Sequence, residues 1–266
     1  MRCVGFFRMF LLCGCVLLFS GAVVPGPEYK RPISAEPNFV EGEFLQFNIG
    51  YGLLNGGKVQ LSVDKEVLNG TTYFHSKAYG YTSGVVDAFF RVRDVYESWF
   101  DIQTNIPVKG IRNVREGRYR HYDEFTYFHD QEYVQSSRKG RVEVPRNALD
   151  MTCVFYYMRR IDFSRFQVGD IVYMDTYFNG KHFPFYVQFR GREEVSLPLG
   201  TFRTLKFVPV VEPGRIFKKK DDMTIWFSDD ENKIPLRVQF DAVVGSFKCD
   251  LESYRNLKFP LRSKIR

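Results

Sequence analysis

The sequence contains few cysteines and none of the motifs that mark common enzyme classes. Five cysteines occur in 266 residues, and the four histidines are scattered. The sequence has no HExxH pair, no GxSxG elbow, no Walker loop and no dinucleotide-binding fingerprint. We therefore assign no catalytic residue, no metal ligand and no cofactor, and an enzyme is unsupported.

Long apolar runs are also missing beyond the N-terminus. Arg2 and Arg8 precede an apolar stretch from Met9 to Phe19, and Ser20-Gly21-Ala22 has the small-x-small pattern of a cleavage site. This arrangement predicts a secretory signal peptide over residues 1–22. No later segment reaches the roughly 18 apolar residues of a spanning helix, so we expect an exported mature chain without a transmembrane segment, in the periplasm or associated with the cell envelope.

A lipoprotein form is the less favoured alternative. Leu12-Cys13-Gly14-Cys15 loosely imitates a lipid-attachment pattern. However, the apolar stretch continues from Val16 to Phe19, where a polar tether would be expected.

Removal of the signal peptide would leave only Cys153 and Cys249. In an oxidising compartment these two could form one disulfide. Two buried thiols are the slightly preferred interpretation, because a free cysteine packs as a small apolar residue and a domain of this size does not need the bond.

The chain is mildly basic. Its formal net charge is +7, of which Arg2 and Arg8 contribute two. Lys218-Lys219-Lys220 and the C-terminus are the densest basic stretches, and we interpret them as a solvated loop and a frayed tail. Export and the near balance of 38 basic and 31 acidic residues argue against a nucleic-acid partner.

Aromatic residues are abundant, with 27 Phe and 16 Tyr, and they favour pleated sheets. Alternating apolar and polar residues recur along most of the chain. Asn55-Gly56-Gly57, Asn69-Gly70 and Asn179-Gly180 have the chemistry of tight hairpin turns. The sequence therefore predicts a mainly β fold, with a large curved antiparallel sheet or a partial or closed β-barrel meander.

One packed α-helix is expected at about residues 147–160. Pro145-Arg146-Asn147 offers a possible cap. Met151, Val154, Phe155 and Met158 follow at helical spacing and would form the packed face.

The chain is expected to form a single domain. Residues 1–22 are the predicted signal peptide, and the proline-rich residues 23–40 are expected to form an extended leader. Residues 41–258 would form the β-rich domain, and residues 259–266 the basic tail.

Short motifs in a fixed order resemble an exported bacterial family catalogued as domain of unknown function 3108. They are Gly42-Glu43-Phe44-Leu45, Asp94-Val95-Tyr96-Glu97-Ser98, Asp150 through Tyr157 with Arg159, Pro198-Leu199-Gly200-Thr201-Phe202, Ile225-Trp226-Phe227-Ser228-Asp229-Asp230, Pro235-Leu236 and Gly245-Ser246. The resemblance spans nearly the whole mature domain. It implies an exported β-rich protein and brings no activity or catalytic residue.

Acidic residues at 229–231, together with Asp221-Asp222, could supply oxygen ligands to a divalent cation. Turn formation is the preferred interpretation, because the EF-hand spacing is absent.

Aromatic side chains could line an apolar cavity inside the sheet. The candidates are Tyr96, Trp99, Phe155, Tyr156, Phe183, Phe185 and Phe189. A densely packed core is the preferred explanation for the same residues. Two functions stay open: binding of a lipid or other apolar ligand, and a structural or scaffolding role in the envelope through contacts with a protein partner.

Overall fold

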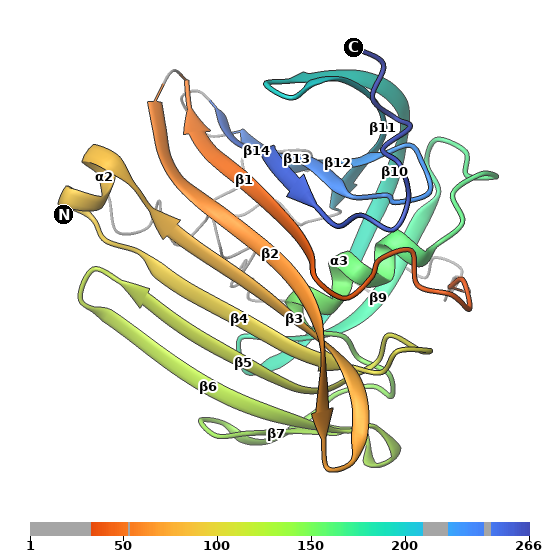
Figure 1. Ribbon diagram of the computed structural model, residues 1–266. Helices are drawn as coiled ribbons and strands as arrows, with labels where there is room; N and C mark the ends of the chain where they lie inside the picture. The colour runs from red at the N-terminus through yellow and green to blue at the C-terminus, as the bar shows by residue number, and fades with distance from the viewer. Residues whose placement is uncertain (1–32, 53, 210–222, 242–245) are drawn as a thin grey trace.

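The computed structural model describes residues 33–52, 54–209, 223–241 and 246–266. In these residues a single antiparallel sheet of 14 strands curls around a concave interior (Figure 1). The predicted mainly β fold is confirmed. The predicted signal peptide, the start of the leader, Lys218-Lys219-Lys220 and Asp221-Asp222 lie outside the described residues.

The sheet consists of two meanders joined through β1 and β14. Its order is β8-β7-β6-β5-β4-β3-β2-β1-β14-β13-β12-β11-β10-β9. The strands are β1 (Glu43–Tyr51), β2 (Leu54–Leu68), β3 (Thr71–Thr82), β4 (Arg93–Phe100), β5 (Pro107–Glu116), β6 (Tyr119–Phe128), β7 (Tyr133–Ser136), β8 (Gly140–Glu143), β9 (Ile171–Phe178), β10 (Lys181–Leu197), β11 (Gly200–Pro209), β12 (Met223–Ser228), β13 (Pro235–Asp241) and β14 (Ser246–Arg255). The described edges β8 and β9 do not pair with each other, so the barrel is partial.

Two of the three predicted hairpin turns are confirmed. Asn69 and Gly70 both have positive φ angles, of 51° and 81°, and Asn179 and Gly180 have 52° and 77°. This left-handed pair is the backbone conformation that an Asn-Gly turn provides.

The third turn prediction is wrong, because Asn55-Gly56-Gly57 lies inside β2. The register between β1 and β2 shifts at Ile49 and Gly50, opposite this segment. A Cβ atom on Gly57 would lie 2.5 Å from the carbonyl oxygen of Tyr81. Glycine is therefore needed there for the close approach of β3, not for a turn.

Helix α3 (Met151–Arg160) lies on the concave side of the sheet, against β3, β4 and β9 (Figure 1). The helix was predicted at this place, but its start and its buried face were not. Asp150 is the N-cap, and its Oδ1 accepts hydrogen bonds of 3.0 Å from the backbone nitrogens of Thr152 and Cys153. Residues 147–149 are excluded from the helix, because Asn147 has a φ of 66° and Leu149 pairs with β9.

The buried face of α3 is partly polar. Thr152, Cys153, Tyr156, Met158, Arg159 and Arg160 are buried, whereas Met151, Val154 and Phe155 are only half-buried. Thr152 Oγ1 accepts a hydrogen bond of 3.0 Å from Ser76 Oγ on β3. Polar residues on the concave face of the sheet thus satisfy polar residues of the helix.

Arg159 forms a fully buried ion pair with Glu43 of β1. The guanidinium donates to both carboxylate oxygens, at 2.5 and 2.8 Å, and its Nε donates to the carbonyl of Asn232 at 3.0 Å. The exposed fractions of the two side chains are 0% and 1%. This bidentate contact ties the end of α3 to the first strand.

Arg160 fastens the same end of the helix to two loops. Its guanidinium donates to the carbonyls of Ser34 at 2.6 Å and Gln103 at 2.7 Å. Ser34 N also donates to Arg160 O at 2.9 Å. The chain is therefore packed from the first residues described, and Phe39 lies in the core with 2% exposure. The expected leader is too long, since residues 33–40 belong to the folded unit.

The basic tail is not frayed. Ile265 N donates to Thr201 O at 2.9 Å, and Thr201 N donates to Arg266 O at 3.0 Å. Ser263 is fully buried. The tail thus pairs with the start of β11. The segment is short and charged, so no alternation of apolar residues marks it in the sequence.

A second helix was not predicted. The short helix α2 (Gly84–Phe89) connects β3 to β4, and a 3-10 turn (His129–Gln131) follows β6. The six residues of α2 contain no buried position, and they span fewer than two helical turns, too few to show a helical period in the sequence.

The gap between β8 and β9, here called the seam, is closed by side chains and by one extended segment. Leu149 N donates to Asp175 O, and Tyr177 N donates to Leu149 O, both at 2.8 Å. Phe125, Tyr127, Val134, Val144, Ala148 and Tyr177 pack together across the seam.

We predict that Glu43→Gln destabilises the fold by about 3–5 kcal/mol, because it leaves the Arg159 charge buried without its partner. Urea unfolding followed by tryptophan fluorescence measures the change. Glu143→Gln is the matched control, because the Arg141–Glu143 pair is exposed; its stability should be unchanged. Equal midpoints for the two variants would contradict a structural role for the buried pair.

Candidate functional site

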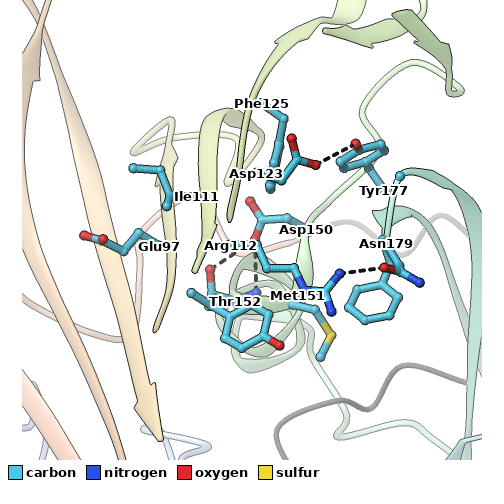
Figure 2. Close-up of a pocket in the computed structure, with 13 residues that line it drawn as sticks. Glu97, Ile111, Arg112, Asp123, Phe125, Asp150, Met151, Thr152, Tyr177 and Asn179 are labelled. Carbon is cyan, nitrogen blue, oxygen red and sulfur yellow. Dashed lines mark hydrogen bonds between the residues drawn. The ribbon is translucent and has the colours of Figure 1, made fainter. Parts of the chain in front are cut away.

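A polar cluster lies beneath the seam, at the N-terminus of α3. Figure 2 shows Arg112 from β5 pointing toward Asn179 of the β9–β10 turn, and Asp123 from β6 pointing toward Tyr177 of β9. Asp150, the N-cap of α3, lies between them. The cluster therefore joins the two halves of the sheet to the helix inside it.

Arg112 connects β5 to the opposite half of the sheet. Its Nη1 donates a hydrogen bond of 2.6 Å to Asn179 Oδ1, and its guanidinium lies 5.5 Å from the ring centre of Phe178. Only 7% of the residue is exposed. A planar guanidinium can make both contacts at once, whereas a lysine could not.

Asp123 makes the second connection. Its Oδ1 accepts from Ser136 Oγ at 2.7 Å and from Ser137 Oγ at 3.0 Å, and its Oδ2 accepts from Tyr177 OH at 3.5 Å. Burial, opposed by a hydrogen bond from Ser136, raises the pKa of Tyr177 to about 12. The phenol therefore stays neutral and keeps its donor hydrogen at physiological pH.

Asp150 is buried within this cluster. Ser98 Oγ donates to its Oδ2 at 2.5 Å and also lies 3.1 Å from Cys153 Sγ. Burial raises the pKa of Asp150, while hydrogen bonds from Cys153, Ser98 and Thr152 act in the opposite direction. Burial likewise raises the pKa of the Cys153 thiol well above its ordinary value, which disfavours the nucleophilic thiolate.

A further buried carboxyl lies beside the cluster, on β4. Asp94 is fully buried, and its Oδ1 accepts from Arg115 N at 2.7 Å. Burial raises the pKa of Asp94 to about 6, although the hydrogen bond from Arg115 and the charge of Arg112 act against the increase. The pKa of Asp94 is thus well above the ordinary value for a carboxyl group.

The space left within the cluster is about 20 Å³, enough for about one water molecule. This polar contact therefore closes the seam and has no room for a ligand.

A ligand-sized space lies further along the seam, and we call it the seam cavity. Its volume is about 400 Å³, and its lining consists of Ile33, Gln103, Thr104, Ile106, Arg146, Asn147, Leu149, Tyr157, Tyr173, Met174 and Asp175. Leu149 and Met174 are buried at its base, whereas Gln103, Thr104, Arg146 and Asn147 are exposed at its rim. The cavity thus has an apolar base and a polar rim.

Charged groups of both signs border the seam cavity. Asp175 accepts hydrogen bonds from His182 Nε2 at 2.8 Å and from Tyr173 OH, and 9% of its side chain is exposed. Arg146 pairs with Asp130 at the rim, where their side chains are 62% and 84% exposed. Because the Arg146 pair is exposed, a bound anion could replace Asp130 at little cost.

Of the seven aromatic residues proposed to line a cavity, only Tyr96 borders the water-sized space, and none borders the seam cavity. Tyr156 and Phe189 are 1% exposed and belong to the filled core, where Phe189 packs on Phe166 and Phe207. Phe155 and Phe185 pack against this core from half-buried positions, and Phe183 lies 6.4 Å from Phe185 between ring centres.

Trp99 lies on the opposite face of β4 from Tyr96. Its ring stacks on that of His75, with ring centres 4.1 Å apart, and its Nε1 donates a hydrogen bond of 2.9 Å to Glu66 Oε2. Neighbours on the convex face cover its ring; one of them is Lys109, whose Nζ lies 5.2 Å from the ring centre.

The two cysteines and the acidic turn that the sequence singled out are part of the packed structure. Cys153 and Cys249 are both free and buried. Asp230 Oδ1 accepts from Ser228 Oγ at 2.9 Å and from Asn232 N at 3.0 Å, as expected of a turn residue. Within the described part of the chain, no group of three or more His, Cys, Asp or Glu side chains could hold a metal ion. No described helix is long and apolar enough to cross a bilayer.

Sequence reasoning missed the residues of the seam cavity. Most come from the β4–β5 loop and the segment before α3, where no periodic pattern applies. Tyr157 lies on the side of α3 away from its predicted face, and only the alternation of Met174 in β9 could have suggested an inward position.

Comparisons with known proteins identify a family and a fold. The family model "Protein of unknown function (DUF3108)" matches residues 46–252. Among curated proteins, none matches the chain. A β-barrel-like protein of domain of unknown function DUF1849 from Brucella abortus is similar, with a TM-score of 0.56 and 8% identity over 82% of this chain and 99% of that one. This likeness supports the barrel-like fold alone.

A second solved structure has a lower similarity. It is a provisionally assigned exported protein with a YmcC-like fold from Bacteroides fragilis, with a TM-score of 0.35 and 12% identity over 84% of this chain and 100% of that one.

We predict that Asp94 makes the protein less stable as the pH rises. Its pKa of about 6 is above the ordinary aspartate value of 3.8, so the folded protein holds the proton more tightly than the unfolded chain does. The resulting stabilisation is complete below about pH 4 and is lost as the pH rises through about 6. Across this pH window, the free energy of unfolding of the wild type should fall by about 2–3 kcal/mol relative to that of the Asp94→Asn variant. Urea unfolding at several pH values measures the difference, and a constant offset between the two proteins would contradict the prediction.

Proposed function

The chain belongs to the family Protein of unknown function (DUF3108), and we propose that it is an exported cell-envelope protein that binds a small amphipathic molecule, a lipid or another largely apolar ligand, in the seam cavity. The observation that carries the proposal is the volume of that cavity, about 400 Å³. Pockets for small ligands typically have volumes of roughly 300–1,000 Å³. The predicted signal peptide supports the export part of the proposal.

The chemistry of the lining favours a ligand with two unlike ends. Ile106, Leu149 and Met174 offer aliphatic surface, and Tyr157 and Tyr173 add aromatic faces. Apolar parts of a ligand would replace water against these side chains. A polar head would lie at the rim near Arg146, where an anionic group could accept hydrogen bonds from the guanidinium.

The central interior is a poorer location for a ligand. Helix α3 occupies the concave side, and Tyr156 packs edge-on against Phe39 with ring centres 4.8 Å apart. Phe163 and Phe189 both pack against Phe207, with ring centres 4.9 and 5.3 Å from that of Phe207, respectively. Rings at these separations are in direct contact, so an acyl chain could enter only by displacing core side chains.

The scaffolding alternative predicts a different behaviour. A protein that acts only through its surface needs no free internal space, and filling the seam cavity would leave its activity unchanged. Ligand titration combined with a cavity-filling variant therefore separates the two functions.

We predict that Ile106→Trp weakens binding of a dansylated fatty acid by roughly tenfold, because the larger ring occupies the space that an acyl chain would fill. Fluorescence titration of the mature protein measures the affinity. Ile106 is half-buried at the cavity wall, so the substitution need not disturb the core. Val168→Trp is the matched control, since Val168 is 69% exposed in the loop between α3 and β9, and it should bind as the wild type does.

Two outcomes would count against the proposal. Equal affinity of both variants would mean that the probe binds elsewhere. No binding by the wild type, together with no lipid or apolar metabolite in a solvent extract of protein purified from its native envelope, would favour the scaffolding alternative.

A further inference from the structure

An exposed apolar group of side chains projects from α2. Val85 and Phe89 are 75% and 86% exposed, and they lie four residues apart on the same side of the helix. Leu54, at the start of the adjacent strand β2, is 70% exposed. Figure 1 shows α2 at one end of the molecule, beside the ends of β2 and β4. We call Leu54, Val85 and Phe89 the apolar tip.

The rest of α2 is held in place. Asp87 accepts hydrogen bonds from Thr82 Oγ1 at 2.6 Å and from both terminal nitrogens of Arg93, at 2.7 and 3.1 Å. Hydrogen bonds from Arg93 and Thr82 lower the pKa of Asp87. Phe90, which directly follows the helix, packs so closely on Gly117 that a Cβ at position 117 would lie 2.9 Å from its ring. The apolar tip is therefore presented to solvent by an anchored helix.

Exposed charges near the apolar tip are cationic. Arg91 follows α2 directly, and its backbone oxygen accepts a hydrogen bond of 2.8 Å from Gly117 N in the β5–β6 turn. That turn contains Arg118, and Arg115 on β5 and Arg120 on β6 flank it; all three are exposed. The nearby carboxylates neutralise them only in part. Asp87 is shared between Arg93 and Arg91, whose Nε lies 3.6 Å from Asp87 Oδ2, and Glu116 is buried.

The pairing register brings two of these arginines together. Arg115 and Arg120 lie directly opposite each other in the β5–β6 ladder. Like charges at such positions destabilise a sheet. An anionic surface that contacted this turn would relieve the repulsion.

We propose that the apolar tip and the surrounding arginines dock the protein on the surface of an anionic phospholipid bilayer. Aliphatic and aromatic side chains would enter the boundary between headgroups and acyl chains, while the arginines contact the phosphates. Three projecting side chains suit this mode of binding. A stable protein interface needs about 800 Å² on each partner, which favours the bilayer over a protein partner. This inference does not depend on the ligand of the seam cavity.

Vesicle flotation of the mature protein tests the proposal. Vesicles of phosphatidylcholine alone are compared with vesicles that contain roughly one-third phosphatidylglycerol. The wild type should float with the anionic vesicles, and added salt should weaken the binding because it screens the arginines.

Two variants separate the apolar and the electrostatic contributions. Phe89→Ser should weaken binding to the anionic vesicles by roughly tenfold, because the ring that would enter the bilayer is lost. The double variant Arg91→Gln, Arg118→Gln should weaken it by roughly tenfold to thirtyfold and should also reduce its salt dependence. Val168→Ser and Arg165→Gln remove an exposed apolar and an exposed basic residue from the α3–β9 loop, and both should bind as the wild type does.

Several results would overturn the proposal. The wild type could fail to float with anionic vesicles, or it could float equally well with neutral vesicles. The third such result is an equal loss of binding in the two test variants and in their controls. Light scattering is the companion measurement: a dimer that Phe89→Ser dissociates would assign the apolar tip to self-association instead. Because Phe89 is 86% exposed, thermal unfolding should be the same for the variant and the wild type, which excludes misfolding as the cause.

Discussion

A twisted sheet of fourteen strands cannot remain flat, and its curl creates a concave side that has to be filled. Helix α3 fills that side, and the buried Glu43–Arg159 ion pair determines how it does so. The pair links the last turn of the helix to β1, the strand through which the two meanders are joined. At the other end of α3, Asp150 caps the helix and accepts a hydrogen bond from Ser98 of β4. The helix is therefore held at both ends by polar contacts with the sheet, and apolar packing completes the core between them.

Small residues on the concave face leave room for this helix. Ser76, Ser98 and Gly110 lie in one row across β3, β4 and β5, because Ser76 pairs with Ser98 and Ser98 with Gly110. The two hydroxyls bond to the first turn of α3. At Gly110 a Cβ would lie 2.4 Å from the ring of Phe125, so the glycine allows that ring to pack over β5 toward the seam. Larger side chains in this row would push α3 away from the concave face of the sheet.

The sequence was a good guide to elements that obey a simple period and a poor guide to their tertiary contacts. Alternation in β1 buries Glu43, Leu45, Phe47 and Ile49 on one face, as the strand period requires. The helical period failed to identify the buried face of α3, since that face includes Thr152 and Arg159. Their burial depends on Ser76 and Glu43, which are distant in sequence. Trp99 failed as a lining residue for a related reason: it pairs opposite His75 on the convex face, where local polar contacts bury it.

The candidate cavity was not predictable from periodicity, because it arises where the sheet fails to close. Strand β9 meets an extended segment near Leu149 instead of β8, and the two are joined there by a single isolated bridge, between Leu149 and Thr176. Both spaces border β9: the water-sized space lies at the end of the strand and the following turn, at Tyr177–Gly180, and the seam cavity lies at Tyr173–Asp175. A closed barrel of the same strands would have no such seam. The incomplete closure therefore accounts for both the polar contact and the ligand-sized space.

Buried charges beneath the seam also select a single register for the sheet. Tyr96 pairs with Arg112, and Arg112 with Asp123, across β4, β5 and β6. A slip of one residue in β5 would turn Arg112 to the convex face and leave Asn179 and Asp123 without this cation in the interior. A row of apolar side chains would lose less free energy in the same register shift, because apolar contacts are less directional than hydrogen bonds. The polar row is thus costly to bury but specific in its pairing. We infer that it holds the edge of the open sheet in position against β9, and that the volume of the seam cavity depends on this alignment.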